Sequence, residues 1–133
     1  MIVADTSVWI DYFNGIDNTH TDLLDQKLDD DLVAIGDLIL VEILQGFKND
    51  KEYKLAKKTL LLLEQRDLLG NENALIAADN YRILRKKGVS IRKTNHVTIA
   101  SYCITHKLPL LFNDKDFEPI AQHLKLISAL SKT

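Results

Sequence analysis

The chain of 133 residues carries a formal net charge of −2, with 46% hydrophobic and 27% charged residues and one cysteine, Cys103. This composition is typical of a globular protein, the length suffices for one domain over residues 1–133, and the small negative charge argues against a general nucleic-acid binder. A single cysteine excludes an intramolecular disulfide, and no apolar run approaches the roughly 18 residues of a membrane span. The sequence therefore predicts a cytoplasmic protein without a membrane segment.

The chain begins with a short apolar stretch that ends at an acid. Ile2 and Val3 have side chains typical of a buried strand, and Asp5 follows them, with the hydroxyls of Thr6 and Ser7 next in the chain. An Asp before a helix is more often a cap than a functional acid. In open α/β sheets, however, ligands bind just outside the carboxyl ends of the strands, so Asp5 is the first candidate site residue.

The rest of the chain alternates helices with short apolar strands. Apolar spacing predicts helices over residues 7–14, 19–28, 37–47, 51–64, 71–87, 96–106 and 119–123. Apolar runs predict strands over residues 32–35, 110–112 and, at the edge of the sheet, 124–127, and the tail from Ser128 is expected to fray. We expect the helices over 51–64 and 71–87 to form a hairpin outside the sheet. This alternation predicts an α/β sandwich with a mainly parallel sheet of four to five strands flanked by helices.

One acid lies within a helix that is predicted to be buried. The helix over residues 37–47 is apolar on nearly every side, and Glu42 is the only charge after its N-cap. A carboxylate in such a place is costly unless it is paired, hydrogen-bonded or bound to a metal. The alternative, equally supported by this stretch, is that the long side chain reaches the edge of the helix and stays in water.

Further acids follow the strand over residues 110–112. Asp114 and Asp116 come after it, and with Asp5 and Glu42 they could meet in one crevice. Carboxylate oxygens without thiolates or clustered histidines favour Mg²⁺ or Mn²⁺. A cation held in this way suits phosphodiester hydrolysis, because it ionises a water molecule and neutralises the charge on the phosphate.

Positive charge is concentrated in one part of the sequence. Residues 80–113 contain no acid, whereas residues 17–50 are rich in acids. Runs of charge are usually solvated helix faces, but a basic segment near an acidic centre would also suit a phosphodiester substrate. The candidate RNA-binding residues are Arg82, Arg85, Lys86, Lys87, Arg92 and Lys93.

Four motifs together resemble a PIN domain and, more narrowly, the VapC toxins of bacterial VapBC toxin–antitoxin modules. In chain order they are Asp5-Thr6-Ser7 with the residues up to Asp11, Glu42 with Leu44 and Gly46, Ile99-Ala100 after a capped turn, and Asn113-Asp114-Lys115-Asp116-Phe117. The resemblance covers nearly the whole chain. It implies a PIN-like three-layer sandwich and a Mg²⁺- or Mn²⁺-dependent endoribonuclease toxin that cuts structured RNA. It also implies a homodimer and a VapB-type antitoxin whose C-terminal segment lies across the active-site groove.

The resemblance also assigns the site residue by residue. It places metal ligands at Asp5, Glu42 and Asp114, a further catalytic acid at Asp116, and hydrogen-bonding support at Thr6, Ser7 and Asn113. Asn95 stands where the family pattern has an Asp, at the start of the helix before Ile99-Ala100, and it is taken as the fourth metal and catalytic position. An amide brings no negative charge, so we expect Asn95 to weaken metal binding and activity.

Two other functions remain open. The first is a catalytically inactive PIN-like module that binds RNA or an antitoxin, which Asn95 favours. The second is a small phosphatase-like hydrolase with the same metal site, which the lack of a phosphate-binding loop disfavours.

Overall fold

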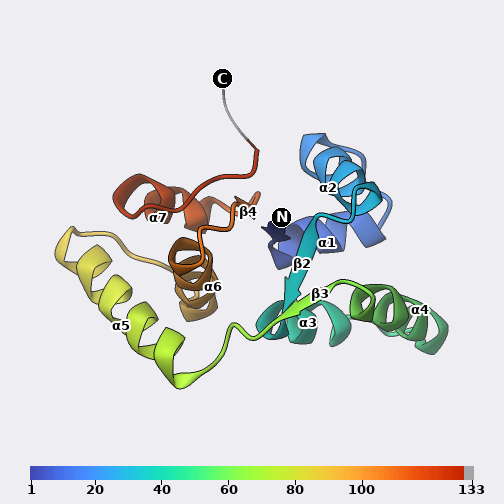
Figure 1. The fold of residues 1–133 in the computed structure, drawn as a ribbon, viewed down its shortest axis with the longest axis horizontal. Helices are drawn as coiled ribbons and strands as arrows, with labels where there is room; N and C mark the ends of the chain where they lie inside the picture. Colours follow the sequence, from blue (N-terminus) through green and yellow to red (C-terminus); the bar gives the residue numbers. More distant parts are fainter. Residues whose placement is uncertain (131–133) are drawn as a thin grey trace.

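A computed structural model describes residues 1–130 and contains one parallel sheet between helices (Figure 1). The strands are β1 (Ile2–Ala4), β2 (Val33–Gly36), β3 (Glu64–Arg66) and β4 (Leu110–Leu111), in the order β3-β2-β1-β4. Every neighbouring pair is parallel, and the register pairs Ile2 with Val33 and Val3 with Leu110. The predicted α/β fold with a parallel sheet is therefore confirmed.

Seven α-helices of the described residues cover this sheet. They are α1 (Thr6–Phe13), α2 (Thr19–Asp29), α3 (Asp37–Leu44), α4 (Asp50–Leu61), α5 (Asn71–Lys86), α6 (Thr94–Thr105) and α7 (Glu118–His123), and a 3-10 helix, η1 (Lys115–Phe117), precedes α7. Helices α1 to α4 gather on one half of the molecule and α5 to α7 on the other (Figure 1). None of the helices in residues 1–130 combines the length and apolar character that a membrane crossing requires.

β1 occupies the position in the sheet at which a binding crevice is expected. β1 lies between β2 and β4, so the chain leaves its carboxyl end toward α1 while the chain after β4 turns toward η1 on the other side. In parallel sheets, such a divergence of the connections opens a binding crevice at the carboxyl ends of the two strands. Asp5 follows β1, and Asp114 lies three residues after β4.

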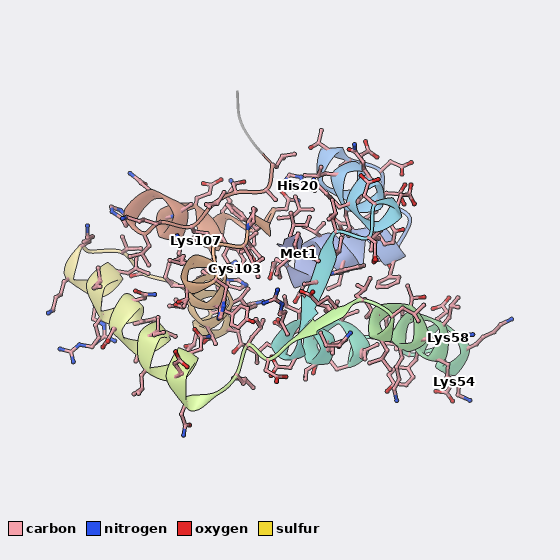
Figure 2. The ribbon with its side chains drawn as sticks, viewed as in Figure 1. Met1, His20, Lys54, Lys58, Cys103 and Lys107 are labelled. Carbon is pink, nitrogen blue, oxygen red and sulfur yellow. The ribbon has the colours of Figure 1, made fainter. Side chains whose placement is uncertain are left out.

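Helix α6 is the central helix of the core. His96, Val97, Ile99, Ala100 and Cys103 are all buried on it. Figure 2 shows Cys103 among the side chains around α6. Burial raises the pKa of the Cys103 thiol to about 12, so this cysteine is a packing residue and not a nucleophile.

The helix hairpin expected from the sequence is not present. Helix α4 ends at Leu61, and the strand β3 (Glu64–Arg66), which was not predicted, separates it from α5. Helix α4 packs against α3, whereas α5 packs against α6. β3 is short and largely exposed, and it belongs to the sheet through backbone pairing with β2, so it carries no apolar signal.

Two other boundaries also differ from the expectation. Helix α3 ends at Leu44 and not at residue 47. No strand forms over residues 124–127; the chain pairs with β4 only at one parallel bridge, between Leu110 and Ser128. Ser128 is thus tied to the sheet, and the tail expected to fray lies, from residue 131 on, outside the described residues.

Candidate functional site

Asp5 is almost completely buried at the junction of β1 and α1. Its backbone N–H donates to the Leu111 carbonyl at 2.8 Å, which fixes it beside the end of β4. The side chain is 2% exposed and does not cap α1. Oδ2 accepts a hydrogen bond from Ser7 Oγ at 3.1 Å, whereas Oδ1 is buried without a protein partner. Burial raises the pKa of Asp5, although the nearby His96 acts in the opposite direction.

His96 is the residue of α6 that faces the acids. It lies in the first turn, is 3% exposed, and its ring packs against Phe117 with a centroid distance of 4.4 Å. Its Nδ1 is 2.6 Å from Asp116 Oδ2. Because an ionised carboxylate can only accept, Nδ1 carries the proton, and in the neutral ring the lone pair is on Nε2.

Asp116 is held by hydrogen bonds on both of its oxygens. Oδ1 accepts from the backbone N–H of Arg92 at 3.0 Å, and Oδ2 accepts from that of Lys93 at 3.3 Å as well as from His96. Burial acts to raise the pKa of Asp116, but these hydrogen bonds outweigh it and hold the pKa below its ordinary value. The carboxylate thus fixes the loop before α6 and the orientation of the imidazole.

Asp114 lies on the other side of the imidazole. Its Oδ1 accepts from the backbone N–H of Asp116 at 2.9 Å and is 3.4 Å from Arg92 Nη2. Its Oδ2 lies 4.0 Å from His96 Nε2. The imidazole therefore faces Asp116 with one nitrogen and Asp114 with the other.

Glu42 is connected to this cluster through the start of α1. Thr6 Oγ1 donates to Glu42 Oε1 at 2.9 Å, just as Ser7 donates to Asp5, so the two consecutive hydroxyls hold one acid each. Glu42 itself is half-buried on α3. It borders a hollow of about 130 Å³ whose other lining residues are Ile10, Phe13, Ile43, Gly46 and Phe47.

The structure does not bring Asn95 to the acids. Asn95 is exposed, and the residue that faces the acids is His96, one position later in α6. Consecutive helix residues point about 100° apart, so only one of the two can face the crevice. The helical spacing of the apolar residues on α6 could have identified His96. It lies three residues before the buried Ile99 and therefore on the same face of the helix. Asn113 is also exposed and makes no contact that supports the cluster among the described hydrogen bonds.

The basic residues divide into two groups, and all six are exposed. Arg92 borders the acids, in a hollow of about 610 Å³ that Lys115 and Pro119 also line. Arg82 and Arg85 line a different hollow, of about 590 Å³, beside α5 and α6. Lys115 is a basic residue of the acidic crevice that the sequence reasoning missed.

A divalent cation fits the chemistry of the cluster. No three His, Cys, Asp or Glu side chains of residues 1–130 already surround one point as metal ligands do, so binding would require side chains to turn. Asp5 Oδ1 nevertheless has no partner, and the Arg92 side chain that touches Asp114 is 72% exposed and free to leave. Asp5 lies close enough to His96 for the ring to lower its pKa, and Asp114 Oδ2 lies 4.0 Å from His96 Nε2, so both acids adjoin the same imidazole. Asp5 and Asp114 are therefore the acids that could hold a cation after their side chains turn.

Comparison with known proteins gives one consistent family. The model of the PIN domain family matches residues 2–122. Ribonuclease VapC11 of Mycobacterium tuberculosis is 28% identical over 131 residues, which cover 97% of this chain and 98% of that protein.

Solved structures share the fold. VapBC2 from Rickettsia felis, bound to a DNA fragment from its promoter, aligns with a TM-score of 0.75 at 20% identity over 96% of this chain and 97% of that one. FitAcB from Neisseria gonorrhoeae aligns with a TM-score of 0.74 at 18% identity over 96% of each chain. At these identities the structural matches establish the fold.

Proposed function

Because this chain belongs to the PIN domain family, we propose that it is a metal-dependent endoribonuclease toxin of the VapC type, paired with an antitoxin. The observation that carries the proposal is the cluster at the ends of β1 and β4, where the imidazole of His96 lies between Asp114 and Asp116 and close enough to Asp5 to lower its pKa. The similarity to a VapC ribonuclease over 97% of the chain supports the same activity.

Each residue near the acids would have its own role in phosphodiester cleavage. Asp5 and Asp114 would hold Mg²⁺ or Mn²⁺, and Ser7 orients Asp5 through its hydroxyl. When bound, the cation supplies an ionised water and neutralises charge on the scissile phosphate. Asp116 fixes the imidazole of His96, while Glu42 is held by Thr6 at the rim of the crevice.

Positive side chains would guide the RNA to this crevice. Arg92 and Lys115 line the hollow at the acids, and their charges attract the phosphates on either side of the bond that is cut. The exposed basic residues of α5 and the following turn extend this positive surface away from the acids; they are Arg82, Arg85, Lys86 and Lys87. Phosphate contacts of this kind make binding steeply dependent on salt.

An antitoxin segment would cover the crevice and its apolar neighbour. Solved structures that share this fold are toxin–antitoxin complexes. In this chain, the apolar hollow beside Glu42 would take an apolar side chain, and a Lys or Arg of the segment would pair with the carboxylates in place of the cation. Co-expression with the neighbouring gene product, followed by pull-down, tests this partner.

We also propose a homodimer. Leu55 and Leu62 are 66% and 80% exposed, and they lie seven residues apart on one face at α4, on the other half of the molecule from the basic residues of α5 (Figure 1). A second copy packed on this face would remove those side chains from water. Analytical ultracentrifugation of the purified chain tests the assembly.

One observation favours the alternative of an inactive binding module. His96 occupies the centre of the acid cluster, and an imidazole brings one negative charge fewer than a carboxylate would. In that case the chain would bind RNA or an antitoxin without cutting.

Cleavage of a structured RNA distinguishes the two functions. The purified chain is incubated with labelled RNA across a titration of Mg²⁺ or Mn²⁺, with EDTA as the zero point. We expect cleavage that requires the cation, is abolished in Asp5→Asn and is unchanged in the exposed control Asp79→Asn. RNA that is bound but stays intact with every cation would support the inactive module.

A further inference from the structure

We propose that His96 is itself a metal ligand of this site and that it shifts the preferred ion from Mg²⁺ to a divalent transition metal such as Mn²⁺. The inference rests on the proposed function, because it concerns the same cation site. It follows from how the imidazole is held, where its free nitrogen points, and which ions accept nitrogen.

The imidazole is held as metal-binding histidines are held. Asp116 accepts from Nδ1 at 2.6 Å, and two backbone N–H groups fix Asp116 in turn. A carboxylate bound to one ring nitrogen sets the tautomer, orients the ring and makes the other nitrogen a stronger ligand. The ring cannot swing away, because it is 3% exposed and packs against Phe117.

The free nitrogen of the imidazole lies near Asp114. His96 Nε2 lies 4.0 Å from Asp114 Oδ2, too far for a hydrogen bond. Two atoms that bind one ion at about 2.0–2.2 Å each can be up to about 4.4 Å apart, so this separation allows both to reach a single ion. Asp5 adjoins the same imidazole and its buried Oδ1 has no other partner, so a small turn of the side chain would add it as a third donor.

A donor set of two carboxylates and one imidazole selects among ions. Mg²⁺ binds oxygen ligands and depends strongly on their negative charge, whereas imidazole suits Mn²⁺ and other first-row transition ions. A carboxylate in the place of His96 would add a negative charge and an oxygen ligand. The imidazole supplies neither, so it weakens Mg²⁺ more than Mn²⁺.

The direct test is electron spin-echo spectroscopy of Mn²⁺ bound to the full chain. A coordinated imidazole modulates the Mn²⁺ echo through its ¹⁴N nucleus, and biosynthetic [¹⁵N]histidine changes that modulation. We expect nitrogen modulation in the unmodified chain, its replacement by the ¹⁵N pattern after labelling, and its loss in His96→Asp. The exposed His106 provides the matched control, since His106→Asn should leave the signal unchanged.

The affinities of the two ions provide a second readout. We expect competition experiments to give a ratio of Mn²⁺ affinity to Mg²⁺ affinity that is at least about tenfold higher in the unmodified chain than in His96→Asp. Asp116→Asn removes the residue that orients the imidazole, so it should weaken Mn²⁺ binding by about 10–100-fold. Circular dichroism checks that each variant is folded, and the measurement on the unmodified chain needs no variant.

Each outcome decides the inference. Mn²⁺ bound with histidine nitrogen modulation supports it, even if no RNA is cut, in which case only the proposed activity fails. Mn²⁺ bound with oxygen ligands alone overturns the inference and leaves the proposed function standing. The same holds if the ratio of Mn²⁺ to Mg²⁺ affinity is equal in the unmodified chain and in His96→Asp. A chain that binds neither ion overturns both.

Discussion

Replacing the buried Asp5 by Asn should stabilise the metal-free protein while it destroys the site. The side chain is 2% exposed, Oδ1 has no partner, and burial raises its pKa. Asn has nearly the same shape and keeps an oxygen that accepts from Ser7, but it carries no charge. The substitution therefore removes the cost of an uncompensated buried carboxylate, a cost that the metal would otherwise offset.

The size of the effect follows from the charge, because the amide NH2 of Asn would be as buried and unpartnered as Oδ1 is. A buried group without a partner costs about 1–3 kcal/mol when neutral and more when charged, and the nearby His96 offsets part of that excess. We expect Asp5→Asn to raise the free energy of unfolding by about 1–2 kcal/mol at neutral pH. For a chain of 133 residues this corresponds to a Tm about 4–7 °C higher.

The effect has a defined dependence on pH. The pKa of Asp5 is raised above its ordinary value of 3.8, so folding favours the protonated form. The contribution of Asp5 to stability is therefore greatest at low pH and is lost as the pH rises through the folded-state pKa. The advantage of Asp5→Asn should therefore be small at a pH near 3.8 and grow as the pH rises toward neutrality.

Thermal and urea unfolding in EDTA measure this advantage, with Asp79→Asn as a control that should stay within about 0.5 kcal/mol of the unmodified chain. Saturating Mn²⁺ should then stabilise the unmodified chain but not Asp5→Asn, by about 2.7 kcal/mol at 100 times the Kd. An Asp5→Asn protein that is no more stable than the unmodified chain at neutral pH would show that the buried charge of Asp5 has no net cost.

Three other predictions follow from the contacts of the crevice. Asp116→Asn should lower the free energy of unfolding by about 1–3 kcal/mol at neutral pH, because the amide cannot accept all three hydrogen bonds. Since the folded-state pKa of Asp116 is lowered, this loss should shrink as the pH falls below 3.8, and urea unfolding at several pH values measures it. In a cleavage assay, Asn95→Asp should change the rate by no more than about twofold relative to the unmodified chain. His96→Asp should raise the Mg²⁺-dependent rate relative to the Mn²⁺-dependent rate. The reverse pattern would indicate that residue 95, and not His96, is the fourth ligand. Arg92→Glu should weaken RNA binding more than Arg82→Glu does, as measured by filter binding at several salt concentrations. Equal losses of affinity would count against RNA binding at the acids beside Arg92.

The strands that build the crevice could be predicted because their side chains are buried. The apolar pairs Ile2-Val3 and Leu110-Leu111 mark β1 and β4, and the acids that follow them lie at the same edge because the strands are parallel. β3 could not be predicted in this way. Glu64–Arg66 joins the sheet through backbone pairing alone, and a polar edge strand leaves no apolar pattern in the sequence.

The fourth position of the site shows how a motif and a helix phase can disagree. The resemblance placed it at Asn95, but the buried face of α6 runs through His96, Ile99 and Cys103. The spacing of three and four residues between these positions was readable in the sequence. The contacts of Arg92 with Asp114 and Asp116 were not, because they depend on the path of an irregular loop.

Anomalous scattering from a crystal of the full chain grown with Mn²⁺ shows whether Asp5, Asp114 and His96 bind one ion. We expect one strong peak at the ends of β1 and β4, within about 2.0–2.4 Å of carboxylate oxygens of Asp5 and Asp114 and of His96 Nε2, with Arg92 displaced from Asp114. Arg92 still on Asp114 and no peak between the two acids at saturating Mn²⁺ would contradict this expectation.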